Sequence, residues 1–248
     1  MTWYYLALWL AGIGLESVLV ARAWVWRGFE RFPLFSFYIV WILIQDIFFL
    51  IIYRSLYPFP YASIYWYTEF LSIAAGCAVC WEIFRFVLRP YPGASRMARS
   101  LLLISIIGGI FKAVLATPLE LSSWGIIALA FERNLRGVQA LGLVVLALLC
   151  MYYRIPMSRN TKGIFLGYGM VVASYLITLT SFRYSWNLLH PLSYLVVLII
   201  WCTSLWRYEP EPLPRGNLAL ELDYQSLVLA TRKGLLQART ALDRSTPP

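Results

Sequence analysis

Long apolar segments, separated by short polar stretches, follow one another along the chain. A helix needs about 20 apolar residues to cross a hydrocarbon core roughly 30 Å thick. Because lipid offers no partner to a free backbone N–H or C=O, each of these segments must be helical. The pattern therefore predicts an all-α polytopic membrane bundle of seven transmembrane helices. They are expected at residues 3–20, 33–53, 64–86, 100–117, 132–153, 163–181 and 188–206.

Basic side chains concentrate in every second polar stretch. Of the 21 Lys and Arg residues, 16 follow the first, third, fifth and seventh apolar segments. Since Lys and Arg favour the cytoplasmic side, the N-terminus is predicted outside and the C-terminus in the cytoplasm. The expected location is a cell membrane, specifically the cytoplasmic membrane of a bacterium. The 16 residues are Arg22, Arg27, Arg31, Arg85, Arg89, Arg96, Arg99, Arg154, Arg159, Lys162, Arg207, Arg215, Arg232, Lys233, Arg239 and Arg244.

Composition agrees with a membrane protein. Hydrophobic residues make up 60% of the chain and charged residues 13%, whereas a soluble domain carries about 25% charged residues. The net charge of +9 would suggest a nucleic-acid partner in a soluble protein. Here the basic residues lie between apolar segments, so topology and anionic headgroups account for them. We expect the lipid bilayer as a partner and no nucleic acid.

The sequence changes character after the last apolar segment. Residues 1–207 are the predicted transmembrane domain, residues 208–216 a Pro-rich linker, and residues 217–248 a cytoplasmic tail with an amphipathic basic helix over 217–244. Such a helix typically lies on an anionic leaflet; the alternative is docking to a cytoplasmic protein or dimerisation. Its apolar stripe is Leu220, Tyr224, Leu227, Leu235, Ala238 and Leu242.

One short segment resembles a known group of proteins. Residues 82–91, with the sequence EIFRFVLRPY, are similar to a segment of uncharacterised bacterial seven-helix membrane proteins. The resemblance covers the end of the third predicted helix and the polar stretch after it, and it implies no activity.

Ionisable side chains within the apolar segments are the candidates for a functional site, because a charge inside a bilayer is costly. In the predicted topology they occupy five helices at a similar depth in the outer half of the membrane. Both charge signs at one depth favour an outward-open pocket for a small polar ligand. The candidate pocket residues are Asp46, Glu69, Lys112, Glu132, Arg136 and His190.

The same residues have a structural interpretation. Lys112 is a potential ion-pair partner of Asp46 or Glu69. Glu132 and Arg136 are four residues apart and can pair on one helical face. They are expected at the outer end of their helix, at the membrane surface.

Other charged residues are expected near the helix ends. Arg133, like Arg136, can extend its side chain to the surface, and His190 fits an interfacial position. Glu16 and Glu82 are interpreted as inner-end anchors, with Glu82 paired to Arg85 three residues later.

Cysteine and histidine usage argues against a metal or cofactor, and we expect neither. Cys77 and Cys80 form a C-x-x-C on one helical face, which is best read as apolar packing. A single histidine excludes H-E-x-x-H motifs. Small-residue pairs, Gly163 with Gly167 and Gly108 with Gly109, predict close helix packing.

Four functional hypotheses remain open. A receptor-like or sensory domain fits the polar belt best, and the first alternative is a structural or assembly subunit whose charges are all paired internally. Small-solute transporters often show repeats and broken helices, and the sequence shows neither, but an unwound helix at Gly108-Gly109 would favour this function. A membrane-embedded enzyme has the least support, since no catalytic motif is present, and enzymatic activity is not expected.

Overall fold

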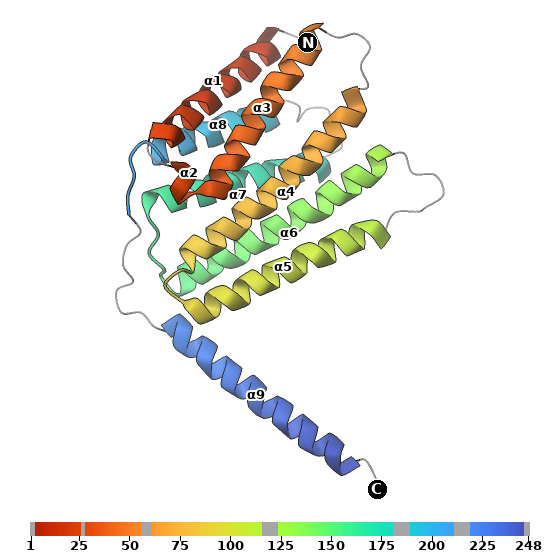
Figure 1. Ribbon diagram of the computed structural model, residues 1–248, viewed down its shortest axis with the longest axis vertical. Coiled ribbons are helices and arrows are strands. Elements are labelled where there is room, and N and C mark those ends of the chain that lie inside the picture. Colours follow the sequence, from red (N-terminus) through yellow and green to blue (C-terminus); the bar gives the residue numbers. More distant parts are fainter. Residues whose placement is uncertain are drawn as a thin grey trace.

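The computed structural model describes residues 3–25, 28–55, 61–115, 124–180, 189–210 and 219–245 (Figure 1). Within these ranges the regular structure is entirely helical. The helices are α1 (Trp3–Val25), α2 (Gly28–Arg31), α3 (Pro33–Ser55), α4 (Tyr61–Val87), α5 (Pro92–Leu115), α6 (Trp124–Tyr152), α7 (Arg159–Thr180), α8 (Leu189–Ser204) and α9 (Ala219–Ser245).

The long helices pack as a closed ring. α5 lies beside α4, α4 beside α3, α3 beside α1, and α1 beside α8; α8, α7 and α6 then lead back to α5. α4 also contacts α6 and α7 across the ring. As a result α4 is the most buried of the apolar helices, and α5 is the least buried.

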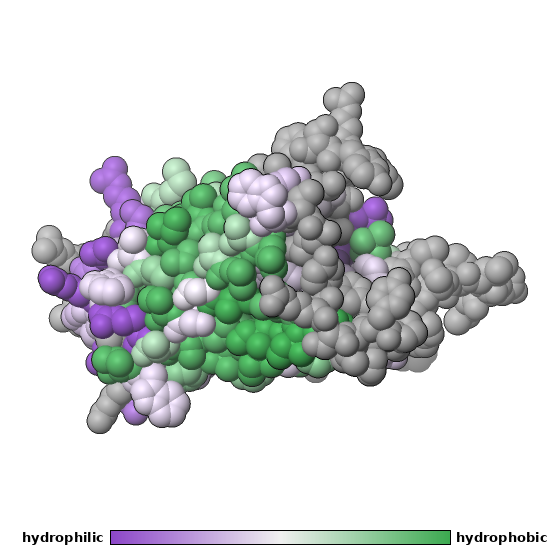
Figure 2. All heavy atoms as spheres, turned by 90° about the horizontal axis from the view of Figure 1, so that it is seen from above, coloured by the Kyte–Doolittle hydropathy of each residue, from purple (hydrophilic) through white to green (hydrophobic). Residues whose placement is uncertain are grey.

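Six of the described helices are long and apolar enough to cross a membrane: α1, α3, α4, α5, α6 and α7. On the face seen in Figure 2, hydrophobic side chains cover the middle of the molecule, which we call the hydrophobic belt, and hydrophilic side chains gather at one end. These features fit a multi-pass membrane protein. α8 is apolar but has only 16 residues, or about 24 Å of helix, which is shorter than a hydrocarbon core of about 30 Å.

Two helices begin eight residues earlier than the hydropathy pattern predicts. α5 starts at Pro92 instead of residue 100, and α6 starts at Trp124 instead of residue 132. Proline is favoured in the first turn of a helix, where its missing N–H costs no hydrogen bond. This accounts for the early start of α5, and both helices extend beyond their most apolar segments. Glu132 consequently lies well inside α6, and its expected position at the helix end is wrong.

Glycines bring α7 and α8 together. A Cβ atom at Gly163 would collide with the side chain of Ser204, and one at Gly167 would collide with the indole of Trp201. The predicted close packing at this pair is confirmed. In α5 only one member of the Gly108-Gly109 pair is close to a neighbour, since Gly109 faces α6 and Gly108 faces open space. The helix continues unbroken through both residues.

Asn160, at the start of α7, joins two parts of the chain that are distant in sequence. Its Nδ2 donates to the backbone oxygens of Ser204 and Arg207, at 3.2 and 3.0 Å. Its Oδ1 accepts a hydrogen bond from the backbone N–H of Glu209 at 2.7 Å. The Glu209 carboxylate in turn accepts one from the backbone N–H of Arg159 at 3.2 Å. The end of α8 and the residues after it are thereby fixed to α7.

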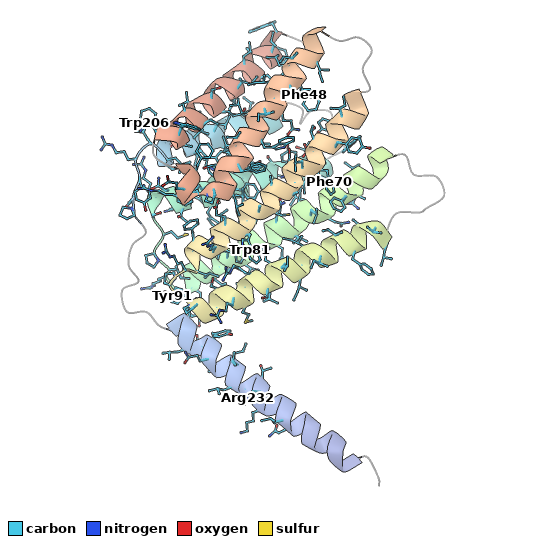
Figure 3. The ribbon with its side chains drawn as sticks, in the orientation of Figure 1. Phe48, Phe70, Trp81, Tyr91, Trp206 and Arg232 are labelled. Atoms are coloured by element: carbon cyan, nitrogen blue, oxygen red, sulfur yellow. The ribbon has the colours of Figure 1, made fainter. Side chains whose placement is uncertain are left out.

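α9 leaves the bundle at a wide angle to the other helices (Figure 1). Its beginning contacts the bundle, where Leu220 is 7% exposed and Tyr153 donates a hydrogen bond to Asp223 at 2.9 Å. Farther along α9, Leu229 and Leu236 are exposed. Arg232 projects from the same part of the helix (Figure 3).

Candidate functional site

Arg136 of α6 lies between two glutamates in the interior of the bundle. Its Nη2 is 3.0 Å from Oε1 of Glu69 on α4, and its Nε is 3.9 Å from Oε1 of Glu132 one turn earlier. The arginine side chain is 1% exposed, and each glutamate side chain is 5% exposed. We call these three residues the central charge cluster. The expected pairing of Glu132 with Arg136 is confirmed, whereas extension of Arg136 to the surface is wrong.

Aromatic and amide side chains surround the central charge cluster. The Arg136 guanidinium lies 4.0 Å from the ring centroid of Tyr175 on α7, a cation–π contact. One turn later, Gln139 donates to the backbone oxygen of Ile73 at 3.2 Å and to Cys77 at 3.1 Å. Tyr168 of α7 donates to Gln139 Oε1 at 3.1 Å. Polar contacts therefore connect α4, α6 and α7 in the centre of the ring.

Two hydrogen-bonding groups of the cluster are unused. Nε and Nη1 of Arg136 are buried and have no hydrogen-bond partner among the described residues. Because a guanidinium carries five N–H donors, Arg136 keeps donor capacity in the middle of the bundle. The cluster is nevertheless closed to solvent, which favours a structural role for it.

A second polar group joins α1, α3 and α8. Glu16 of α1 is fully buried and accepts a hydrogen bond from the hydroxyl of Tyr194 on α8 at 2.6 Å. Asp46 of α3 lies close enough to Glu16 for a side-chain hydrogen bond, and Trp9 contacts Asp46 from α1. We call Glu16 and Asp46 the carboxylate pair. Two carboxylates in contact repel each other unless they share a proton or bind a cation.

A cavity of about 230 Å³ opens beside the carboxylate pair. It is lined by Tyr5, Leu8, Trp9, Gly12, Asp46, Pro191, Tyr194 and Leu195. None of these lining residues is basic. The lining comes from the first half of α1, the second half of α3 and the start of α8, so the cavity lies toward one end of the bundle. We call it the Asp46 cavity.

Tyr38 stands between the two polar groups. It is 2% exposed and lies within electrostatic range of Glu16, Asp46, Glu69 and Arg136. Its ring packs edge-to-face on Tyr168, with the centroids 5.7 Å apart. The central charge cluster and the carboxylate pair are therefore neighbours within one interior, and among the described residues no salt bridge joins them.

The predicted site residues fall into three locations. Glu69, Glu132 and Arg136 form the central charge cluster, whereas Asp46 lines the Asp46 cavity. Lys112 is exposed near the end of α5 and makes no ion pair with Asp46 or Glu69. The expected pairing of Lys112 is therefore wrong, because α5 turns this side chain to the outside of the ring. The backbone of His190 lies in α8, and its side chain lies outside the described residues.

Glu82 does not form the expected ion pair with Arg85. Its two carboxylate oxygens accept hydrogen bonds from the backbone N–H groups of Leu34 and Phe35, at 3.1 and 2.7 Å. These amides belong to the first turn of α3, where N–H groups have no partner within the helix and the helix dipole is positive. Glu82 thus caps α3, which explains its burial at 4% exposure.

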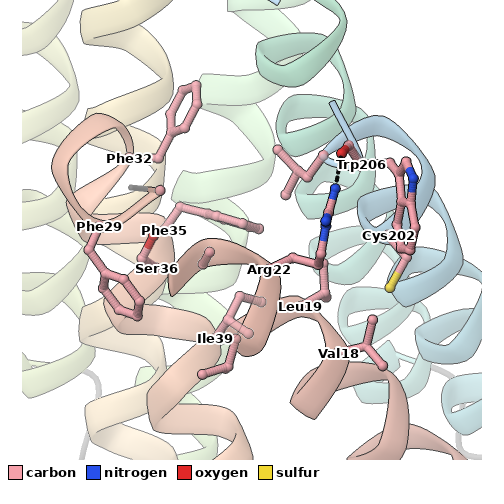
Figure 4. Close-up of a pocket in the computed structure, with 14 residues that line it drawn as sticks. Val18, Leu19, Arg22, Phe29, Phe32, Phe35, Ser36, Ile39, Cys202 and Trp206 are labelled. Atoms are coloured by element: carbon pink, nitrogen blue, oxygen red, sulfur yellow. Dashed lines mark hydrogen bonds between the residues drawn. The ribbon is translucent and has the colours of Figure 1, made fainter. Parts of the chain in front are cut away.

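The remaining candidates show no reactive arrangement. All four cysteines are free, and Cys80 is 1% exposed. Among the described residues, His, Cys, Asp and Glu form no group suited to a metal ion. A narrow apolar crevice of about 40 Å³ lies between α1, α2, α3 and α8. Across it, Arg22 donates to the backbone oxygen of Trp206 at 2.6 Å (Figure 4).

Comparison of the chain with protein-family models, curated proteins and solved structures gives no match. The class of protein is therefore inferred from the fold and the hydrophobic surface alone. Its apolar helices and hydrophobic belt fit a multi-pass helical membrane protein in a lipid bilayer.

Proposed function

We propose that the protein is a receptor-like membrane protein that binds a small organic cation in the Asp46 cavity. The observation that carries this proposal is the cavity lining, in which one carboxylate is accompanied by aromatic rings and no basic side chain. Aromatic faces and a carboxylate together attract ammonium groups. A volume of about 230 Å³ suits a ligand smaller than a drug-sized molecule.

The carboxylate pair supports a cationic ligand over an anionic one. Glu16 has one buried carboxylate oxygen, Oε2, without a hydrogen-bond partner among the described residues. A cation near Asp46 offsets the repulsion between the two carboxylates. The carboxylate pair thus attracts a cation electrostatically, and a neutral polar ligand would not gain this attraction.

The proposed topology has seven spans, an outside N-terminus and a cytoplasmic C-terminus, in the bacterial cytoplasmic membrane. The arginine-rich end of the bundle supports this orientation. In this frame α8 is the seventh span and the Asp46 cavity faces outward. α9 then lies along the cytoplasmic leaflet, with its apolar stripe toward the acyl chains and Arg232 and Lys233 toward anionic headgroups.

The cation proposal is tested by ligand-induced stabilisation. The full chain in lipid nanodiscs is heated with choline, tetramethylammonium or ethylamine, and with acetate as an anionic control. We expect at least one cation to raise the melting temperature of the wild type and of Asp223→Asn, a carboxylate variant at α9. Asp46→Asn should lose the shift. The proposal fails if no cation acts on the wild type, or if Asp46→Asn responds equally.

A structural or assembly role is the second candidate, and the central charge cluster favours it. Its charges are buried and paired across helices, as in a bundle held together by polar contacts. Transporter sites typically contain discontinuous helices, whereas α5 is continuous at Gly108-Gly109. Stability measurements on the cluster, described in the Discussion, separate a structural cluster from a ligand site.

A further inference from the structure

A large cavity lies where α4 ends and α5 begins. Its volume is about 810 Å³, and its walls come from α2, the start of α3, the end of α4, the start of α5 and the segment after α8. The apolar span of α4 ends at Val87, and that of α5 begins at Pro92. The cavity therefore lies where the apolar belt meets the polar end of the bundle, at the depth of lipid headgroups. We call it the arginine cavity.

Five arginines line this cavity: Arg31, Arg85, Arg89, Arg96 and Arg99. Within the part of the chain that the structure describes, none of them forms an ion pair with a carboxylate. Like charges gathered in one concavity repel one another and create a strong positive potential. An anion in the cavity would remove this repulsion.

The two acidic residues of the lining do not neutralise the arginines. Glu82 is buried, and its carboxylate is used by the backbone N–H groups of Leu34 and Phe35. Glu30 is the other acidic residue. Five positive charges therefore face two negative ones, and one of the two is already hydrogen-bonded to α3.

Aromatic side chains hold two of the arginines in place. The Arg31 guanidinium lies 3.5 Å from the ring centroid of Tyr208. Arg99 donates from Nε to the backbone oxygen of Ser95 at 3.1 Å, and its guanidinium lies 5.6 Å from the ring of Trp81. Trp81 is on the part of α4 that approaches the start of α5 (Figure 3). These contacts reduce the freedom that the two guanidiniums would lose on binding a ligand.

We propose that the arginine cavity binds a phosphate monoester, the group carried by phosphatidic acid or by a soluble phosphorylated metabolite. Guanidinium groups bind phosphate oxygens through paired, charge-assisted hydrogen bonds. Several arginines around one site favour a dianionic phosphate over a carboxylate with a single charge. Basic pockets at the cytoplasmic ends of membrane helices commonly bind such headgroups.

Native mass spectrometry of the full chain in a non-ionic detergent tests the proposal without a charged membrane surface. Phosphatidic acid, phosphatidylcholine with the same acyl chains, and glycerol 3-phosphate are titrated separately. We expect one tightly bound phosphatidic acid per chain and much weaker binding of phosphatidylcholine. The double variant Arg89→Gln/Arg96→Gln should weaken the binding by about thirtyfold, since each basic residue near an anionic headgroup adds to the affinity.

The matched control is Arg232→Gln/Lys233→Gln, which removes the same charge from exposed positions of α9. Its affinity should stay within about twofold of the wild type, because no contact places these residues at the cavity. Arg89 and Arg96 are exposed and removal of mutually repelling charges costs no stability, so neither double variant should melt below the wild type. Equal losses in the two variants, or phosphatidylcholine binding as tight as phosphatidic acid, would overturn the proposal.

The soluble ligand distinguishes the source of the phosphate. If glycerol 3-phosphate competes with phosphatidic acid at similar concentrations, the site recognises the phosphate alone, and a free metabolite is a sufficient ligand. If only the lipid binds, the acyl chains contribute and the ligand is a membrane phospholipid. Either result supports the phosphate site, provided that Arg89→Gln/Arg96→Gln loses it.

Discussion

Arg136 of α6 and Glu69 of α4 form an ion pair of 3.0 Å, with side chains only 1% and 5% exposed. Glu132 is the second acidic neighbour of the same guanidinium. Removal of one member of a buried pair leaves the other charge without compensation, which is costlier than removal of both.

Arg136→Met is therefore expected to destabilise the protein by about 3 kcal/mol or more. The double variant Glu69→Gln/Arg136→Met should recover part of this loss. The measurement is the unfolding transition of each variant in nanodiscs. Arg133→Met is the matched control, because Arg133 is exposed on the same helix and should change stability by no more than about 0.5 kcal/mol. An Arg136→Met protein that is more stable than the wild type would instead mark the cluster as a ligand site.

Gly167→Ala is expected to separate α7 from α8. The added Cβ would collide with the buried indole of Trp201, and overpacking of this kind costs about 1–3 kcal/mol. Gly169→Ala is the control in the same helix, since a Cβ at Gly169 meets nothing within 4 Å. Thermal unfolding of the two variants should give a lower melting temperature for Gly167→Ala only. Equal melting temperatures would contradict the close approach of the two helices.

Glu82→Ala is expected to cost about 1–2 kcal/mol, because the first turn of α3 loses both of its carboxylate acceptors. Arg85→Ala should have little effect, since Arg85 is exposed and forms no ion pair with Glu82. Equilibrium unfolding of both variants distinguishes Glu82 as a cap of α3 from Glu82 as an ion-pair partner of Arg85. Similar losses for the two substitutions would favour an ion pair between them.

Tyr153→Phe is expected to loosen the attachment of α9. It removes the hydrogen bond to Asp223, worth about 1 kcal/mol, which corresponds to roughly fivefold faster local opening. Hydrogen exchange at the start of α9 provides the measurement. Tyr152→Phe is the neighbouring control, with a side chain that is 79% exposed, and should leave the exchange unchanged. Protection that is equal in both variants would show that Leu220 and its apolar neighbours hold α9 without the hydrogen bond.

Much of the fold was predictable from hydropathy because lipid leaves an apolar segment no alternative to a helix. The predicted segments 33–53 and 64–86 lie within α3 and α4. The starts of α5 and α6 were not predictable in this way, since they extend beyond the apolar windows. Their lengths depend on Pro92 and on contacts with neighbouring helices, which hydropathy does not measure.

The candidate site was predictable only in part. Depth along a helix follows from the sequence, so Glu69, Glu132 and Arg136 were expected at similar levels. The direction in which a side chain points around the helix axis depends on packing, and this direction separates Lys112 from the others. Tyr194 and Tyr38 gave no usable signal, because aromatic residues make up 17% of the chain and are spread over most helices.

The hydrogen bonds of Asn160 have a mechanical consequence. They hold the backbone from Ser204 to Glu209 against the first turn of α7 at three points. The backbone that is fixed to the bundle therefore continues past the end of α8 as far as Glu209. A tilt or rotation of α7 would therefore also displace the backbone from Ser204 to Glu209, which these hydrogen bonds join to it.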